Sequence, residues 1–179
     1  MKKALITRDA RQILGDSEVT MGSVRIGEKQ SVSPVRILVV DDSEPFRQFI
    51  RSTLERREDL RIVGVASDGL EAVQKSEELQ PDLILLDIGL PSLNGIEAAK
   101  RICKLAPKSK IIFMSLESSK DVVRGALSSG ANDYIAKSNA ASDLLVAVEA
   151  VLQGKQFVSA GLTDQIITNP QQGKATGLI

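Results

Sequence analysis

Residues 35–45 of the 179-residue chain read VRILVVDDSEP, and they change from a strand pattern to a helix pattern. The β-branched run predicts a short strand, which stops at two carboxylates, Asp41 and Asp42. Ser43, a residue type whose side-chain oxygen often caps a helix, and Pro45 then predict a helix start. A strand followed directly by a helix is the repeating unit of α/β proteins.

The same alternation continues through the middle of the chain. Strands are expected at residues 35–40, 60–66, 81–86, 110–115 and 132–136. Helices are expected from 43–45 onward, over 68–79, from 94 onward, and over 119–129 and 140–153. Because parallel strands need right-handed crossovers, this pattern predicts a doubly wound, five-stranded parallel sheet. Helices on both faces would make it a flavodoxin-like, three-layer α/β sandwich.

The composition excludes several classes of function. Lys and Arg total 23 and Asp and Glu total 23, so no net charge attracts nucleic acid or an anionic membrane. The absence of histidine excludes Ser-His-Asp catalysis and imidazole metal sites, and the lone Cys103 excludes an internal disulfide. No apolar run approaches the roughly 20 residues of a membrane span. We therefore expect a cytoplasmic protein that contacts neither nucleic acid nor membrane directly.

Three regions are expected along the chain. Residues 1–34 lack sustained periodicity and are expected to form a flexible leader, with Met21 as an alternative start of translation. Residues 35–157 form the α/β domain, and residues 158–179 are expected to be a flexible tail. That tail is shorter than the roughly 40 residues that an independent domain needs, so no output domain is expected in it.

Polar residues follow four of the expected strands, where ligands bind in open α/β sheets. They are Asp41 and Asp42, Asp87, Ser115 and Lys137. Carboxylates brought close together repel one another unless a cation compensates them, and an all-oxygen site favours a hard cation such as Mg²⁺. A lysine opposite a metal ion would leave a place where a phosphoryl group is stabilised.

Each of these residues also has a plainer explanation when it is taken alone. Asp42 could cap the first helix, and Lys137 could be a solvated charge. Ser115 could be an ordinary strand-end residue, and Asp87 could belong to a turn. Their shared placement at the ends of strands favours a functional site, because chance would rarely produce it.

Four motifs in this order and spacing resemble a known family. They are VVDD at 39–42, LLDIGLP at 85–91 with NGIE at 94–97, Ser115, and YIAK at 134–137. Over about residues 35–157, the chain resembles the receiver domains of bacterial two-component response regulators. The Ser138 that follows the last motif and the ending GKQFVS are most similar to the branch whose members carry a helix-turn-helix output domain.

The resemblance implies a phosphoacceptor site with Mg²⁺ as its cofactor. Asp87 would attack the phosphorus of a kinase phosphohistidine. Asp42, Asp87 and the backbone carbonyl of Gly89 would ligate the ion, while Asp41 would act through a bound water. Because the chain itself has no histidine, the donor imidazole must belong to a partner.

The resemblance also implies a phosphorelay switch instead of an enzyme, although the domain would assist its own phosphotransfer and slow autodephosphorylation. Lys137 would contact the phosphoryl oxygens, Ser115 would move to hydrogen-bond them, and Tyr134 would change rotamer. The partners would be a sensor histidine kinase or histidine phosphotransfer protein, a downstream protein target, and a second copy in a phosphorylation-dependent homodimer. Leu116 stands where a small residue is common, so partly obstructed access is expected.

Three functions compete on this basis. The favoured one is a stand-alone receiver, and the alternative is a fragment of a DNA-binding transcriptional regulator whose output domain is missing. The third is an enzyme or cofactor binder of similar topology. A phosphatase with an Asp nucleophile would offer a second acid at Gly89, and Asp41 and Asp42 would repel a flavin phosphate.

Overall fold

The computed structural model describes residues 33–117, 119–129 and 133–159. The leader expected at 1–34 and the tail expected at 158–179 therefore lie outside the described residues, apart from two residues of each. Among the helices in the described ranges, none is both long and apolar enough to span a membrane.

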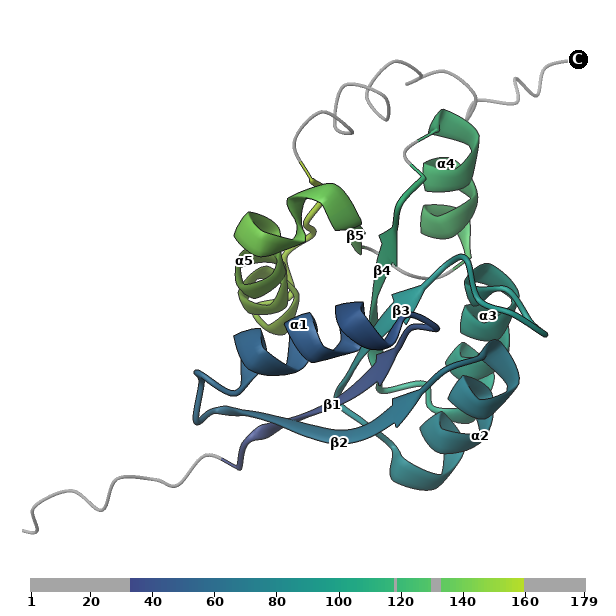
Figure 1. Cartoon of the computed structure of the whole chain (residues 1–179). Coiled ribbons are helices and arrows are strands. Elements are labelled where there is room, and N and C mark those ends of the chain that lie inside the picture. The colour runs from purple at the N-terminus through teal and green to yellow at the C-terminus, as the bar shows by residue number, and fades with distance from the viewer. Residues whose placement is uncertain (1–32, 118, 130–132, 160–179) are drawn as a thin grey trace, which may run out of the picture. The chain divides into compact units, whose positions relative to one another are not determined.

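A single sheet of five parallel strands forms the centre of the fold (Figure 1). The strands are β1 (Val35–Val40), β2 (Leu60–Ala66), β3 (Leu83–Asp87), β4 (Lys110–Ser115) and β5 (Asp133–Ala136). Their order across the sheet is β2-β1-β3-β4-β5, which is the flavodoxin-like order. The predicted fold class is therefore confirmed.

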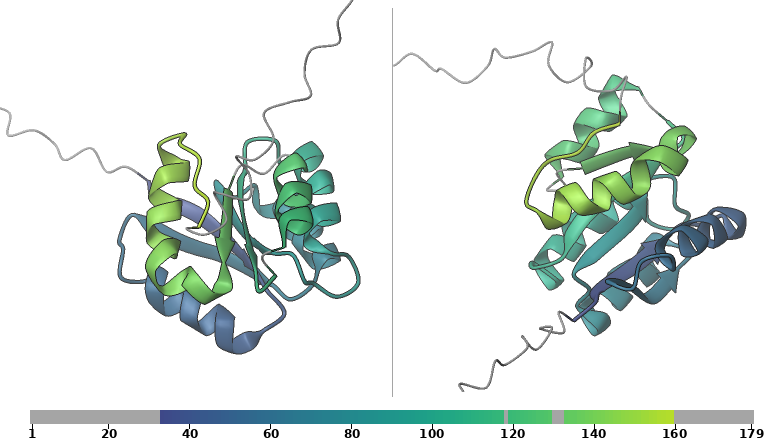
Figure 2. Two further views of the ribbon diagram at one scale, coloured as in Figure 1. Left: turned by 90° about the horizontal axis from the view of Figure 1, so that it is seen from above. Right: turned by 90° about the vertical axis from the view of Figure 1, so that its left-hand side faces the viewer.

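Helices cover both faces of this sheet. They are α1 (Glu44–Leu54), α2 (Gly69–Leu79), α3 (Gly95–Leu105), α4 (Lys120–Ser128) and α5 (Ala140–Leu152), with a 3₁₀ turn, η1 (Lys137–Asn139), before α5. Figures 1 and 2 show α1 and α5 on one face and α2, α3 and α4 on the other. Right-handed crossovers produce this arrangement, because the chain moves across the sheet in one direction from β1 to β2 and in the other direction from β3 to β4.

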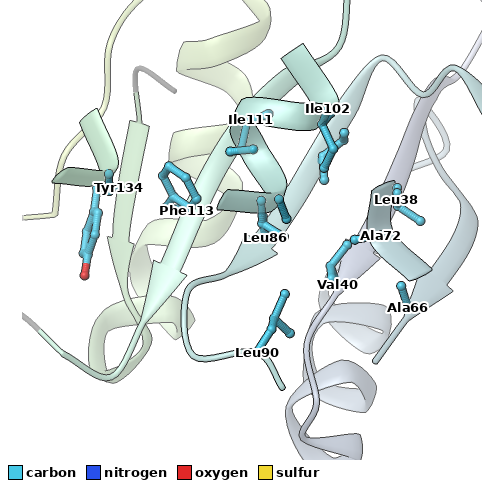
Figure 3. Close-up of a cluster of buried hydrophobic side chains, with 14 of the residues drawn as sticks. Leu38, Val40, Ala66, Ala72, Leu86, Leu90, Ile102, Ile111, Phe113 and Tyr134 are labelled. Atoms are coloured by element: carbon cyan, nitrogen blue, oxygen red, sulfur yellow. The ribbon is translucent and has the colours of Figure 1, made fainter. Parts of the chain in front are cut away.

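The core is divided by the sheet into two apolar clusters. Leu38 and Val40 of β1 point into the cluster beneath α2 and α3, which Figure 3 shows. Ile37 and Val39 alternate with them and point into the cluster beneath α1 and α5. Strands covered on both faces are apolar on both faces, which explains the continuous apolar runs in the sequence.

The sequence predicts a capping side chain at three helix starts, and two of these predictions are confirmed. Asp68 accepts hydrogen bonds from two amides at the start of α2, and Asn94 accepts one from the amide of Glu97 in α3. Ser43 is the N-cap residue of α1, but its side chain makes no capping hydrogen bond. Its amide instead donates to Asp41 Oδ1 at 2.9 Å, so the expected serine cap is wrong and a site carboxylate orders the helix start.

The chain beyond α5 returns to the free edge of β5. Val158 forms a parallel bridge with Tyr134, whose amide donates to the carbonyl of Phe157 and whose carbonyl accepts from the amide of Ser159. The buried Ser159 hydroxyl accepts from the amide of Ala136 and donates to Asp143 on α5. The described residues that pack on the sheet thus include 158 and 159, which lie beyond the boundary expected at residue 157.

Candidate functional site

Acidic residues and a lysine meet at the carboxyl edge of the sheet. Asp41 and Asp42 follow β1, Asp87 is the last residue of β3, and Lys137 opens the turn after β5. One carboxylate oxygen from each of the three aspartates lies within 4.8 Å of the others. The parallel topology therefore brings together the acidic residues that the sequence places far apart.

Lys137 bridges two of these carboxylates. Its Nζ donates to Asp87 Oδ2 at 2.8 Å and lies 2.7 Å from Asp41 Oδ2. The lysine side chain is only 7% exposed, and the Asp41 side chain is fully buried. One ammonium against two buried carboxylates leaves an unbalanced negative charge, to which the exposed Asp42 adds another.

Burial shifts the pKa values of Asp41 and Lys137, and the contact between them opposes both shifts. Loss of water raises the pKa of Asp41, although its contact with Lys137 and the amide of Ser43 oppose the change. Burial alone would lower the pKa of Lys137, but hydrogen bonds to Asp41 and Asp87 outweigh it and raise that pKa. The lysine therefore stays charged and the cluster keeps a buried cation at its centre.

The donor set fits a hard cation. Asp41 Oδ2 is buried, and its partner among the described residues is the ammonium of Lys137, whose Nζ lies 2.7 Å away. Asp42 lies beside Asp41 at the exposed side of the cluster. All three side chains offer carboxylate oxygens, the ligands that Mg²⁺ prefers. The amide of Gly89 donates to Asp87 Oδ1 at 3.2 Å, whereas a metal contact through its carbonyl stays a prediction.

Ser115 and Tyr134 are linked through the loop that follows β4. The buried Ser115 hydroxyl accepts a hydrogen bond from the amide of Glu117 at 3.0 Å. Tyr134 is fully buried, its hydroxyl donates to the carbonyl of Glu117, and burial raises its pKa. Leu116, expected to obstruct access, is 84% exposed and so packs little of its side chain against the domain.

Two site neighbours were missed by the sequence analysis. The Phe46 ring lies beneath Lys137, with 4.7 Å between its centroid and the lysine Nζ. Phe46 belongs with Phe49, Ile50 and Leu54 to the apolar stripe of α1, which packs on the cluster beneath α1 and α5. Its place four residues after Asp42, in the first turn of α1, was the signal that it also faces the site. Arg47 donates to the backbone carbonyl of Asp41, a contact that no residue pattern predicts.

Comparison with curated proteins gives relatives that are longer than this chain. Over 111 residues, 45% are identical to a protein-glutamate methylesterase/protein-glutamine glutaminase of Thermotoga maritima, covering 62% of this chain and 32% of that protein. Over 140 residues, 31% are identical to the transcriptional regulatory protein LnrK of Bacillus subtilis, covering 78% of this chain and 64% of that protein. The chain thus spans about one third to two thirds of the length of these relatives.

The chain also resembles a solved response regulator structure and matches one protein family. A LuxR-family two-component response regulator from an Aurantimonas species superposes with a TM-score of 0.71 and 31% identity, covering 75% of this chain and 96% of that one. Residues 37–149 match the family described as response regulator receiver domain. This match covers more than half of the sequence, and the chain therefore belongs to the response regulator receiver domain family.

Proposed function

We propose that Asp87 accepts a phosphoryl group from the phosphohistidine of a partner, so that the domain acts as a phosphorylation switch. The observation that carries the proposal is the buried Lys137, which bridges Asp87 and Asp41 at the carboxyl edge of the sheet. A carboxylate oxygen of Asp87 bonds to phosphorus as the bond between phosphorus and the donor nitrogen breaks. The imidazole keeps that electron pair, and a carboxylate nucleophile needs no base.

We propose that Asp41, Asp42, Asp87 and the Gly89 carbonyl hold Mg²⁺ during this transfer. The excess of carboxylates over the single ammonium of Lys137 and the exposed Asp42 support the assignment. When bound, Mg²⁺ neutralises the negative charge that builds up when a phosphoryl group approaches a carboxylate. Lys137 would exchange its hydrogen bond with Asp87 for bonds to the phosphoryl oxygens and keep its contact with Asp41.

Ser115 and Tyr134 would change their contacts in response to the phosphoryl group. Phosphorylation adds charge and acceptor oxygens close to the Ser115 hydroxyl, which can donate to them. Glu117 supports a coupled response, because its amide contacts Ser115 and its carbonyl accepts from Tyr134. A movement of this loop toward the phosphoryl group would therefore release Tyr134 and change the face formed by α4, β5 and α5.

The donor would be a sensor histidine kinase or a histidine phosphotransfer protein, because the chain contains no histidine of its own. The output would be a protein contact at the face beside Tyr134, either with a downstream target or with a second copy of the domain. Gel filtration before and after phosphorylation separates these two outputs.

The test of the phosphoacceptor uses acetyl phosphate as the donor, in buffer with and without Mg²⁺. We expect the wild-type protein to gain the mass of one phosphoryl group in a form that hydroxylamine removes, and only with Mg²⁺. Asp87→Asn should gain none, whereas Asp82→Asn, at the opposite end of the same strand segment, should label normally. Hydroxylamine-sensitive phosphate on Asp87→Asn would contradict the assignment.

A further inference from the structure

The Lys137 ammonium is held by three contacts, two of them with carboxylates and one with an aromatic ring. The ammonium is bound to one carboxylate oxygen of Asp41 and one of Asp87. The aromatic ring of Phe46, in the first turn of α1, lies against the ammonium, with 4.7 Å between Nζ and the ring centroid. The ring thus adds an uncharged contact to the two charged ones.

The physical effect of the ring is to fix the ammonium in place. A lysine side chain is a flexible stem with a strongly hydrated head, so two carboxylates at similar distances do not by themselves define its position. The negative face of an aromatic ring attracts a cation, and the attraction grows when water is excluded. Because the ring offers no hydrogen-bond acceptor, it leaves the ammonium protons free for oxygen atoms of the site.

The ring itself is held by the fold. Phe46 lies in the first turn of α1, directly after Pro45, and it packs against the apolar cluster beneath α1 and α5. Its ring and that of Phe49 are 5.6 Å apart at their centroids and are tilted by 32°. The position of the helix therefore determines where the ring presents its face to the lysine.

We propose that Phe46 is a positioning residue for phosphotransfer, whose ring holds the Lys137 ammonium aimed at Asp87. The inference rests on the proposed role of Asp87 as the phosphoacceptor. When a phosphoryl group arrives, the ammonium exchanges its hydrogen bond with Asp87 for bonds to phosphoryl oxygens. It does so without leaving the ring, and Phe46 thereby limits the positions from which Lys137 can meet the incoming charge.

The experiment compares Phe46→Leu, which keeps an apolar side chain but removes the aromatic face, with Phe46→Tyr, which keeps that face. Leu54→Val is the matched control, because Leu54 is buried on the same helix two turns further along. The first measurement is the NMR shift of the Lys137 Cε protons in the unphosphorylated protein without Mg²⁺. We expect the upfield ring-current shift to be lost in Phe46→Leu and kept in the other two variants.

The second measurement is the rate of phosphorylation by acetyl phosphate in the presence of Mg²⁺. We expect Phe46→Leu to be slower by about two- to thirtyfold, the ratio that corresponds to the usual range of cation–π energies. Phe46→Tyr and Leu54→Val should stay near the wild-type rate. A merely structural role would instead lower the thermal midpoint of Phe46→Leu and leave its phosphorylation rate near that of Leu54→Val, so the rate and not the shift separates the two roles.

The two proposals can fail separately. Labelling that persists in Asp87→Asn overturns the role of Asp87, whereas the lysine shift is read without any phosphate and tests the ring contact alone. An unchanged Lys137 shift in Phe46→Leu overturns the positioning role. Equal phosphorylation rates for wild type and Phe46→Leu overturn it as well, even if the shift moves.

Discussion

Glu117 connects two side chains that lie on neighbouring strands. Its amide donates to the hydroxyl of Ser115 at the end of β4, and its carbonyl accepts from the hydroxyl of Tyr134 on β5. Neither contact uses the Glu117 side chain. A shift of the backbone at this position therefore changes both hydrogen bonds together, which makes the loop a direct path between the proposed phosphoryl site and Tyr134.

Removal of the Ser115 hydroxyl should separate phosphorylation from this response. Ser115→Ala should still accept phosphate but shift the Tyr134 region less, since a hydrogen bond to a charged group contributes about 1.5 to 3 kcal/mol. The measurement is the amide shift of Tyr134 and Ile135 before and after phosphorylation. Ser119→Ala, which removes an exposed hydroxyl bound to the Glu117 side chain, is the control. Equal shifts in wild type and Ser115→Ala would remove Ser115 from the path.

The residues of the site differ in how far the sequence predicts them. Asp41, Asp42, Asp87 and Lys137 could be named because apolar runs show where strands end, and parallel strands end at one edge. The contacts of Glu117 and Arg47 could not, because they depend on the course of the backbone and not on a residue pattern. Phe46 was ambiguous, since the same stripe of α1 serves the core and the site.

At the scale of elements, the start of α3 packs directly against the end of β3. A Cβ atom at Gly95 would lie 2.0 Å from the carbonyl oxygen of Asp87, and the Gly95 amide donates to the carbonyl of Ile88 at 3.0 Å. Only a glycine allows this close approach. The backbone of Asp87 can therefore keep its position only because residue 95 has no side chain.

Gly95→Ala should consequently destabilise the protein and disturb the site. Because the clash is with backbone atoms, we expect a loss of more than about 1 kcal/mol in the free energy of unfolding. The matched control is Gly125→Ala in α4, where a Cβ atom would meet only Ile96 Cδ1 at 3.7 Å. That variant should gain about 0.5 to 1 kcal/mol from helix propensity. Urea unfolding measures both values, and a neutral Gly95→Ala would contradict the packing argument.

The elements themselves were largely predictable, and the exceptions have physical reasons. Hydrophobicity placed the third strand at 81–86, whereas β3 runs over Leu83–Asp87 because Asp87 pairs with Met114 in the ladder. A carboxylate is tolerated there because Lys137 pairs with it. Residues 157–159 were not predicted to pack on β5, since three residues are too few to show a period.

At the scale of the whole molecule, buried acids lie at both ends of the sheet. The cluster at the carboxyl edge is paired with Lys137, whereas Asp133 begins β5 at the opposite end and accepts a hydrogen bond from the amide of Phe157 at 2.6 Å. Burial raises the pKa of Asp133, although this hydrogen bond and the charge of Lys110 oppose the change. Asp133 should therefore cost stability whenever it is ionised.

The dependence of stability on pH follows from that sign. Because the folded state holds the Asp133 proton more tightly than the unfolded state, its contribution favours folding at low pH. That contribution is lost as the pH rises from the ordinary pKa of 3.8 through the raised one. Asp133→Asn, which keeps an acceptor for Phe157, should be more stable than wild type at neutral pH and equal to it below that window.

Thermal or urea unfolding across this pH range provides the measurement. Asp121→Asn, which changes an exposed acid on α4, is the control, and it should not gain stability over wild type at neutral pH as Asp133→Asn does. A constant difference between Asp133→Asn and wild type from acid to neutral pH would show that ionisation of Asp133 is not the cause.

The composition and the burial of Tyr134 together have an optical consequence. The chain contains one tyrosine and no tryptophan, so the tyrosine emission of the whole protein comes from a single ring. That ring is fully buried, and its hydroxyl is bound to a backbone carbonyl next to the proposed phosphoryl site. Fluorescence of the unlabelled protein therefore reports on this one hydrogen bond, in real time and without a dye.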